Sequence, residues 1–140
     1  MIIEKINNTL TNTNSVFIYD GSCLYCNTFV NYIFSNDRDQ IFRFMTLNSL
    51  SRMNNLLFEN IPKESSVLII DDKMYVFSDC IIMTFLVLKK HETIMRIVRL
   101  IPEMIRDKIY KIIAKYRYLI GLNRKCNIPP HGFKERIISN

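Results

Sequence analysis

Short apolar runs separated by polar breaks predict four strands in the first half of the chain. The runs have the length of strands and lie at residues 16–19, 41–46, 67–70 and 74–77. The third run, Val67-Leu68-Ile69-Ile70, is continuously apolar, as expected for a strand that is buried on both faces. A polar turn, Asp71-Asp72-Lys73, separates it from the fourth run, so these two strands are predicted to form a hairpin.

Helical periodicity follows the first strand and returns between the others. Cys26, Phe29, Val30 and Ile33 recur at i, i+3, i+4 and i+7, which predicts a helix with one buried face over residues 24–36. Two more helices are predicted from cap residues, one from Ser49 to about residue 60 and one over 80–90 after Ser78-Asp79.

The chain beyond residue 90 is predicted to be helical. Ile94, Ile97, Val98 and Ile101 have helical spacing, and Pro102 suits the first turn of a longer helix that ends near Gly121. In that helix we expect the buried face to be formed by Ile105, Ile109, Ile112, Ile113 and Tyr116. The solvated stripe away from this face is expected to consist of Lys108, Lys111 and Lys115.

The predicted order of elements is βαβ, helix, β-hairpin, helix, which is the order of the thioredoxin-like α/β fold. It implies a four-stranded mixed sheet flanked by helices, in which the first and second strands are parallel and the first and third are central. The length of 140 residues suits one domain. We expect this domain to span residues 16–137, with a helical C-terminal extension from about residue 91, and residues 1–15 to form a polar N-terminal extension.

Charge is distributed unevenly along the chain. Residues 1–88 contain six Lys and Arg against nine Asp and Glu, whereas residues 89–140 contain thirteen against four. This basic half favours an anionic partner, such as nucleic acid, an acidic protein or a membrane surface. Its aromatic residues are not interleaved with basic ones as base stacking requires, which disfavours nucleic acid.

The sequence favours a cytoplasmic protein without a transmembrane segment. The polar start lacks an apolar secretory segment, and the apolar run 81–88 is stopped by Lys89-Lys90, well short of the ~20 residues that span a bilayer. In a reducing compartment a Cys-x-x-Cys pair is more often catalytic or metal-binding than structural.

Two of the four cysteines, Cys23 and Cys26, lie at the transition from the first predicted strand to the first predicted helix. The free N–H groups of a helix start carry partial positive charge and favour a thiolate, so the pKa of Cys23 is expected to fall. Cys26 follows one turn later on the same face, within reach of a disulfide. The pattern therefore indicates a dithiol redox site with Cys23 as the attacking thiolate.

The segment Asp20-Gly21-x-Cys23-x-x-Cys26 resembles the signature of the DCC family of thiol-disulfide oxidoreductases. Matching features recur later in the chain, so that the resemblance covers roughly residues 16–137: Ile101-Pro102, Arg106-Asp107, Tyr110, Ala114, Tyr116-Arg117-Tyr118, Gly121, Cys126 and Pro129. The resemblance implies a thioredoxin-like fold and a redox role for both cysteines.

In this interpretation the protein is a disulfide reductase that uses no cofactor and no metal. Cys23 is the nucleophile, Cys26 resolves the mixed disulfide, and Leu24 and Tyr25 shape the approach of the substrate. Asp20 either ends the strand and satisfies the turn or accepts a proton from Cys26. Gly21 permits a tight turn and a close approach of the backbone. The expected partners are a disulfide-containing protein or small thiol and a reductant that recycles the site.

Other interpretations of these residues stay open at this stage. A zinc-binding or protein-interaction module is an alternative, with ligands from Cys23, Cys26, Cys126 and His131. Cys80, in contrast, is expected to be a small core residue at a helix start. Thioredoxins carry a Pro just before the third strand, whereas here the segment 63–67 contains none.

Overall fold

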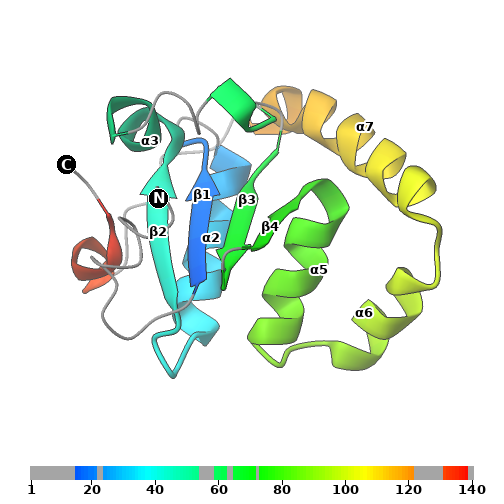
Figure 1. Ribbon diagram of the computed structural model, residues 1–140, viewed down its shortest axis with the longest axis horizontal. Coiled ribbons are helices and arrows are strands. Elements are labelled where there is room, and N and C mark those ends of the chain that lie inside the picture. Colours follow the sequence, from blue (N-terminus) through cyan, green and yellow to red (C-terminus); the bar gives the residue numbers. More distant parts are fainter. Residues whose placement is uncertain are drawn as a thin grey trace.

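The computed structural model describes residues 15–21, 24–53, 59–62, 65–71, 73–121 and 131–138. Within these residues, four strands form one sheet in the order β2-β1-β3-β4 (Figure 1). Their bounds are β1 Ser15–Tyr19, β2 Phe42–Thr46, β3 Val67–Ile70 and β4 Lys73–Val76. β1 pairs in parallel with β2 and antiparallel with β3, and β3 pairs antiparallel with β4.

This topology is that of an α/β thioredoxin-like fold. Helix α2 (Leu24–Asn36) connects the parallel pair β1 and β2 and lies behind the sheet in Figure 1. Its predicted bounds of 24–36 are confirmed. The prediction that the first and third strands are central is also confirmed, because β1 and β3 are the inner strands of the sheet.

The side chains of β1 alternate between two apolar layers. Phe17 and Tyr19 pack on one face with Val30 and Ile33 of α2 and with Cys80 of α5 (Phe77–Val87). On the other face, Val16 and Ile18 pack with residues that include Leu50 of α3 (Leu47–Met53) and Ile61. Burial on both sides explains why β3 and residues 16–19 of β1 are continuously apolar.

Two predicted helix caps are wrong because the helices begin earlier. α3 starts two residues before Ser49, and the Oγ1 of Thr46 accepts the N–H of Ser49 at 3.2 Å, so the last residue of β2 provides the cap. α5 starts at Phe77, which places Ser78 and Asp79 inside its first turn. Correspondingly, β4 is shifted one residue back from the predicted 74–77.

Two helices follow the core, α6 (Glu92–Arg99) and α7 (Glu103–Gly121). Both contact α5, and α7 also contacts α2. The prediction of a buried face on α7 is wrong, because all five of its residues are exposed: Ile105, Ile109, Ile112, Ile113 and Tyr116. Among the residues of α7 with described side chains, the more buried positions are instead Arg106, Asp107, Tyr110 and Ala114, so the helix meets the core mainly through polar groups.

The end of the described chain returns to the sheet. The 3-10 helix η1 (Phe133–Arg136) lies beside β2, where the N–H of Ile138 donates to the carbonyl oxygen of Phe44 at 2.7 Å. Arg136 is buried here and forms an ion pair with Asp37, the residue that follows α2. Among the described residues, no helix combines the length and the hydrophobicity that a membrane span requires.

Candidate functional site

One edge of the sheet gathers the segments that carry the Cys-x-x-Cys motif. The parallel strands β1 and β2 both end there, with Tyr19 opposite Thr46. β3 runs the other way and begins there, with Val67 opposite Ile18. The end of β1, the turn at Gly21, the start of α2 and the loop before β3 therefore meet at this edge.

Helix α2 begins at Leu24, the residue after Cys23. Its first turn contains no acidic residue, so no carboxylate on the helix offsets the partial positive charge of its free N–H groups. Cys26 is the third residue of the helix. Cys23 itself lies outside the described residues, as do the side chains of Leu24, Tyr25 and Cys26.

The turn between β1 and α2 passes close to β2. Gly21 is exposed, but a Cβ atom built on it would lie 3.1 Å from the Cγ2 of Thr46. Any larger residue would therefore push against the end of β2, which supports the predicted close approach of the backbone. Asp20, directly after β1, is half-buried.

The loop before β3 is held by a hydrogen bond within the loop and by hydrogen bonds to two helices, α5 and α7. The Oγ of Ser65 donates to the carbonyl oxygen of Ser66 at 2.6 Å and accepts the N–H of Phe77 at 2.7 Å. The N–H of Ser66 donates to the hydroxyl of Tyr110 on α7 at 3.3 Å. This loop occupies the place where thioredoxins carry Pro, so here polar contacts fix the segment that Pro stiffens there.

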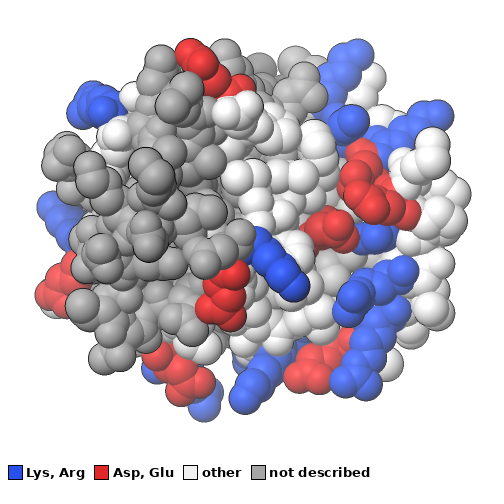
Figure 2. Space-filling view, in the orientation of Figure 1, with Lys and Arg blue, Asp and Glu red and all other residues white. Residues whose placement is uncertain are grey.

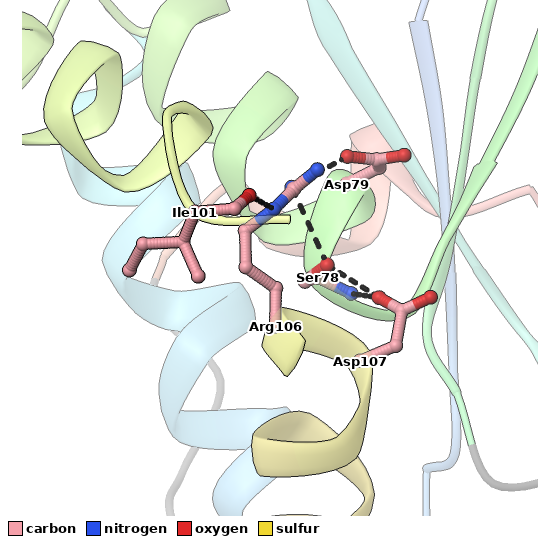
Figure 3. Close-up of polar contacts among 5 residues, drawn as sticks. All are labelled: Ser78, Asp79, Ile101, Arg106 and Asp107. Atoms are coloured by element: carbon pink, nitrogen blue, oxygen red, sulfur yellow. Dashed lines mark hydrogen bonds and ion pairs between the residues drawn. The ribbon is translucent and has the colours of Figure 1, made fainter. Parts of the chain in front are cut away.

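A second set of polar contacts joins the start of α5 to the start of α7 (Figure 3). Asp107 accepts a hydrogen bond from the hydroxyl of Ser78 and another from its N–H, the latter at 3.3 Å. Arg106 donates to the carboxylate of Asp79 at 2.8 Å and to the carbonyl oxygen of Ile101 at 3.0 Å. α7 is thereby anchored beside the loop that Tyr110 contacts.

The remaining predicted site residues are not brought together within the described residues. Cys80 is fully buried in the core, which confirms its predicted structural role, and His131 lies exposed in a turn. Cys126 lies outside the described residues, as do the side chains of Arg117 and Tyr118. In the part of the chain that is described, no three His, Cys, Asp or Glu side chains are placed to hold a metal ion.

Sequence reasoning missed the contribution of Ser65 and Ser66 to this edge. Their signal was weak, since two serines before a strand are usually only part of a loop. Tyr110 and Arg106-Asp107 supported the family resemblance, but their contacts to Ser66 and to the start of α5 join residues between 27 and 44 positions apart. No periodicity or spacing predicts contacts over such separations.

Comparison with known proteins identifies the family to which the chain belongs. The family described as DCC1-like thiol-disulfide oxidoreductase matches residues 17–122, which include nearly all of the sheet, the Cys-x-x-Cys motif and α7. A protein of Bacillus subtilis (strain 168), named uncharacterized protein YuxK, is 30% identical over 129 residues, covering 89% of this chain and 94% of that protein. No solved structure matches the chain significantly. The chain therefore belongs to the DCC1-like thiol-disulfide oxidoreductase family.

Proposed function

We propose that this protein is a thiol-disulfide oxidoreductase of the protein-disulfide reductase type that works through a Cys23–Cys26 dithiol. The observation that carries the proposal is the start of α2 at the residue after Cys23, at the edge where β1 ends. Membership of a family of thiol-disulfide oxidoreductases supports the same chemistry. The substrates implied are disulfides and thiols.

The proposed reaction has two exchange steps. The Cys23 thiolate attacks one sulfur of a substrate disulfide, which forms a mixed disulfide and releases the other substrate sulfur as a thiolate. The Cys26 thiol then loses its proton, attacks the sulfur of Cys23 and releases the second substrate thiolate. Both thiolates take up protons, so the substrate gains two electrons while Cys23 and Cys26 become a disulfide. A small thiol or a dithiol protein must then reduce this disulfide for another cycle.

Residues near the cysteines are assigned supporting roles in this proposal. Asp20 is half-buried after β1, at the edge where the helix begins, and would accept the proton of Cys26. Leu24 and Tyr25 stand between the two cysteines and would shape the approach of the substrate. Gly21, which lies against Thr46, would keep the turn free of a side chain, so that a substrate can reach the first turn of α2.

We place this activity in the cytoplasm, where thiol pools keep a dithiol reduced and ready to act on a disulfide. There the protein would act as a reductase, on a disulfide-containing protein or a small disulfide.

The test measures the reduction of insulin disulfides by the full chain with dithiothreitol as the electron source. Cys23→Ser should reduce turnover to the rate of dithiothreitol alone, because no thiolate remains to attack. Cys26→Ser, reduced first and then mixed with insulin after the dithiothreitol has been removed, should stop after the first step and accumulate a mixed disulfide that a mass spectrum detects. The matched control is Cys80→Ala, which removes a buried thiol and should keep the wild-type rate.

Wild-type turnover in both Cys23→Ser and Cys26→Ser would contradict the proposal. So would one equivalent of zinc in protein purified without added metal, if Cys126→Ser and His131→Ala each release it. That result would favour the alternative of a Cys₃His zinc module.

A further inference from the structure

The exposed apolar side chains of the described residues are concentrated on α6 and α7. Twelve large apolar side chains are exposed in the described residues, and ten of them lie between residues 94 and 116. Those before α7 are Ile94, Ile97, Leu100 and Ile101. Those on α7 are Met104, Ile105, Ile109, Ile112, Ile113 and Tyr116. We call these ten residues the α6–α7 apolar surface.

This surface is the side of the two helices that points away from the core. α6 turns Met95 and Val98 toward the protein and leaves Ile94 and Ile97 outside. The exposure is greatest where α6 meets α7, with Leu100 83% exposed and Met104 86% exposed. A concentration of exposed large apolar side chains of this kind marks a site of interaction with a protein or a membrane.

Basic side chains border this surface. Residues 89–121 contain nine Lys and Arg against three Asp and Glu. On α7, the exposed residues Lys108, Lys111 and Lys115 recur at helical spacing beside the isoleucines. Figure 2 shows Lys and Arg side chains around uncharged surface over α6 and α7, with fewer acidic side chains among them.

We propose that the α6–α7 apolar surface docks on an anionic lipid bilayer. The isoleucines would enter the boundary between headgroups and acyl chains, while the lysines would extend to the lipid phosphates. Interfacial helices have this composition, with one apolar face and Lys or Arg beside it. The cytoplasmic leaflet, which carries anionic lipids, is the matching surface.

Charge argues against a second copy of this chain as the occupant. An isologous contact would bring two basic surfaces of the same kind together, and like charges across an interface oppose association. The bilayer offers the opposite charge and needs no shape complementarity. An acidic protein would offer the charge as well, but the surface runs along the outer side of two helices, which favours a flat partner over a bound segment.

The test is flotation of the full, reduced protein with vesicles. Phosphatidylcholine vesicles that contain phosphatidylglycerol should bind the protein, vesicles of phosphatidylcholine alone should bind it weakly, and high salt should weaken the anionic binding. Ile109→Glu should lower the partition coefficient at least about tenfold. An apolar side chain that would be buried in the bilayer is replaced by a negative charge, which the anionic lipids repel. The matched control is Met74→Glu, which introduces the same charge at another exposed apolar residue, on β4, and should bind like wild type.

A second variant keeps the test decisive if Ile109→Glu misfolds, which circular dichroism would reveal. Lys108→Gln with Lys115→Gln changes only exposed side chains and should lower binding to anionic vesicles about tenfold. The proposal is overturned if wild type binds neither vesicle, if Ile109→Glu binds as well as wild type, or if light scattering shows a dimer that Ile109→Glu dissociates. Cys23→Ser should bind vesicles normally, so this outcome is independent of the redox activity.

Discussion

At the scale of single residues, Cys80 shows why the position of a thiol decides its chemistry. Cys80 is fully buried against the sheet. Burial raises the pKa of its thiol far above the ordinary value, and the nearby Thr84 hydroxyl lowers it only in part. A thiol that stays protonated is a poor nucleophile, so Cys80 cannot substitute for the exposed thiolate that exchange requires.

This shift predicts a specific dependence of stability on pH. In the unfolded chain the Cys80 thiol ionises above about pH 9.0, whereas in the folded protein it keeps its proton. The stability from this residue is therefore fully present below that pH and is lost as the pH rises further, by about 1.4 kcal/mol per pH unit. Urea unfolding measures the free energy of unfolding of wild type and of Cys80→Ala at several pH values. The difference between the two should become smaller from pH 9 to pH 10, because only the wild type has this thiol. A difference that stays constant over this range would contradict the assigned burial.

Arg136 is the second residue whose role depends on burial. Its guanidinium pairs with Asp37 and donates to the carbonyl oxygen of Phe42 at 3.1 and 3.0 Å. Burial lowers the pKa of Arg136, and the Asp37 carboxylate opposes this shift. Removing one partner of a buried pair leaves the other charge without its counter-ion, which is costly.

Arg136→Met should therefore lower the free energy of unfolding by about 2–4 kcal/mol. Lys134→Met, at an exposed position of the same 3-10 helix, is the control and should change stability little. Urea unfolding measures both, and equal small effects would show that the contacts of Arg136 with Asp37 and Phe42 do not fasten the C-terminal segment to the core. No local pattern predicts this pair, because its partners are 99 residues apart.

At the scale of elements, local signals predicted where helices occur better than where they begin. The bounds of α2 follow from signals within its own segment and the turn before it, and its apolar positions face one layer of the core. α5 illustrates the failure: no side chain of its own N-cap residue, Val76, caps it. Asp107 of α7 instead accepts the N–H of Ser78, so the cap comes from a distant helix that sequence spacing does not reveal.

Asp107 thus brings a negative charge to the positive end of α5 and also ties α7 to the core. Asp107→Ala should lower the free energy of unfolding by about 1–2 kcal/mol, because it removes two hydrogen bonds and that charge. Glu103→Gln, at an exposed position one turn earlier in α7, should have less effect. If thermal unfolding finds the two variants equally stable, the contact between α7 and α5 does not contribute as proposed.

The inner face of α7 was mispredicted for a related physical reason. Five apolar residues at helical spacing usually mark the side that packs on a core. Here Arg106, Asp107 and Tyr110 face the core because each has a specific polar partner there, on Asp79, Ser78 and Ser66. The periodicity correctly identified which residues form the apolar stripe of α7. It did not show that this stripe faces away from the core.

At the scale of the whole molecule, the order of strands and helices was enough to predict the thioredoxin-like sheet. The parallel β1–β2 pair and the β3–β4 hairpin follow from connection lengths and apolar runs. The loop before β3 was not predictable, since its contacts come from α5 and α7. Family membership then places the chain among thiol-disulfide oxidoreductases, while the pairing of Cys23 with Cys26 remains our proposal.

We propose that Cys23 and Cys26 form a reversible redox couple at the start of α2. The most direct measurement equilibrates the full protein in glutathione buffers of graded potential, alkylates free thiols and determines by mass spectrometry the fraction with a Cys23–Cys26 disulfide. A reversible couple should give a two-electron transition with a midpoint between about −270 and −120 mV, the range of redox-active dithiol proteins. If no such disulfide forms, or if it stays oxidised until the potential falls below about −300 mV as structural disulfides do, Cys23 and Cys26 are not a redox-active couple.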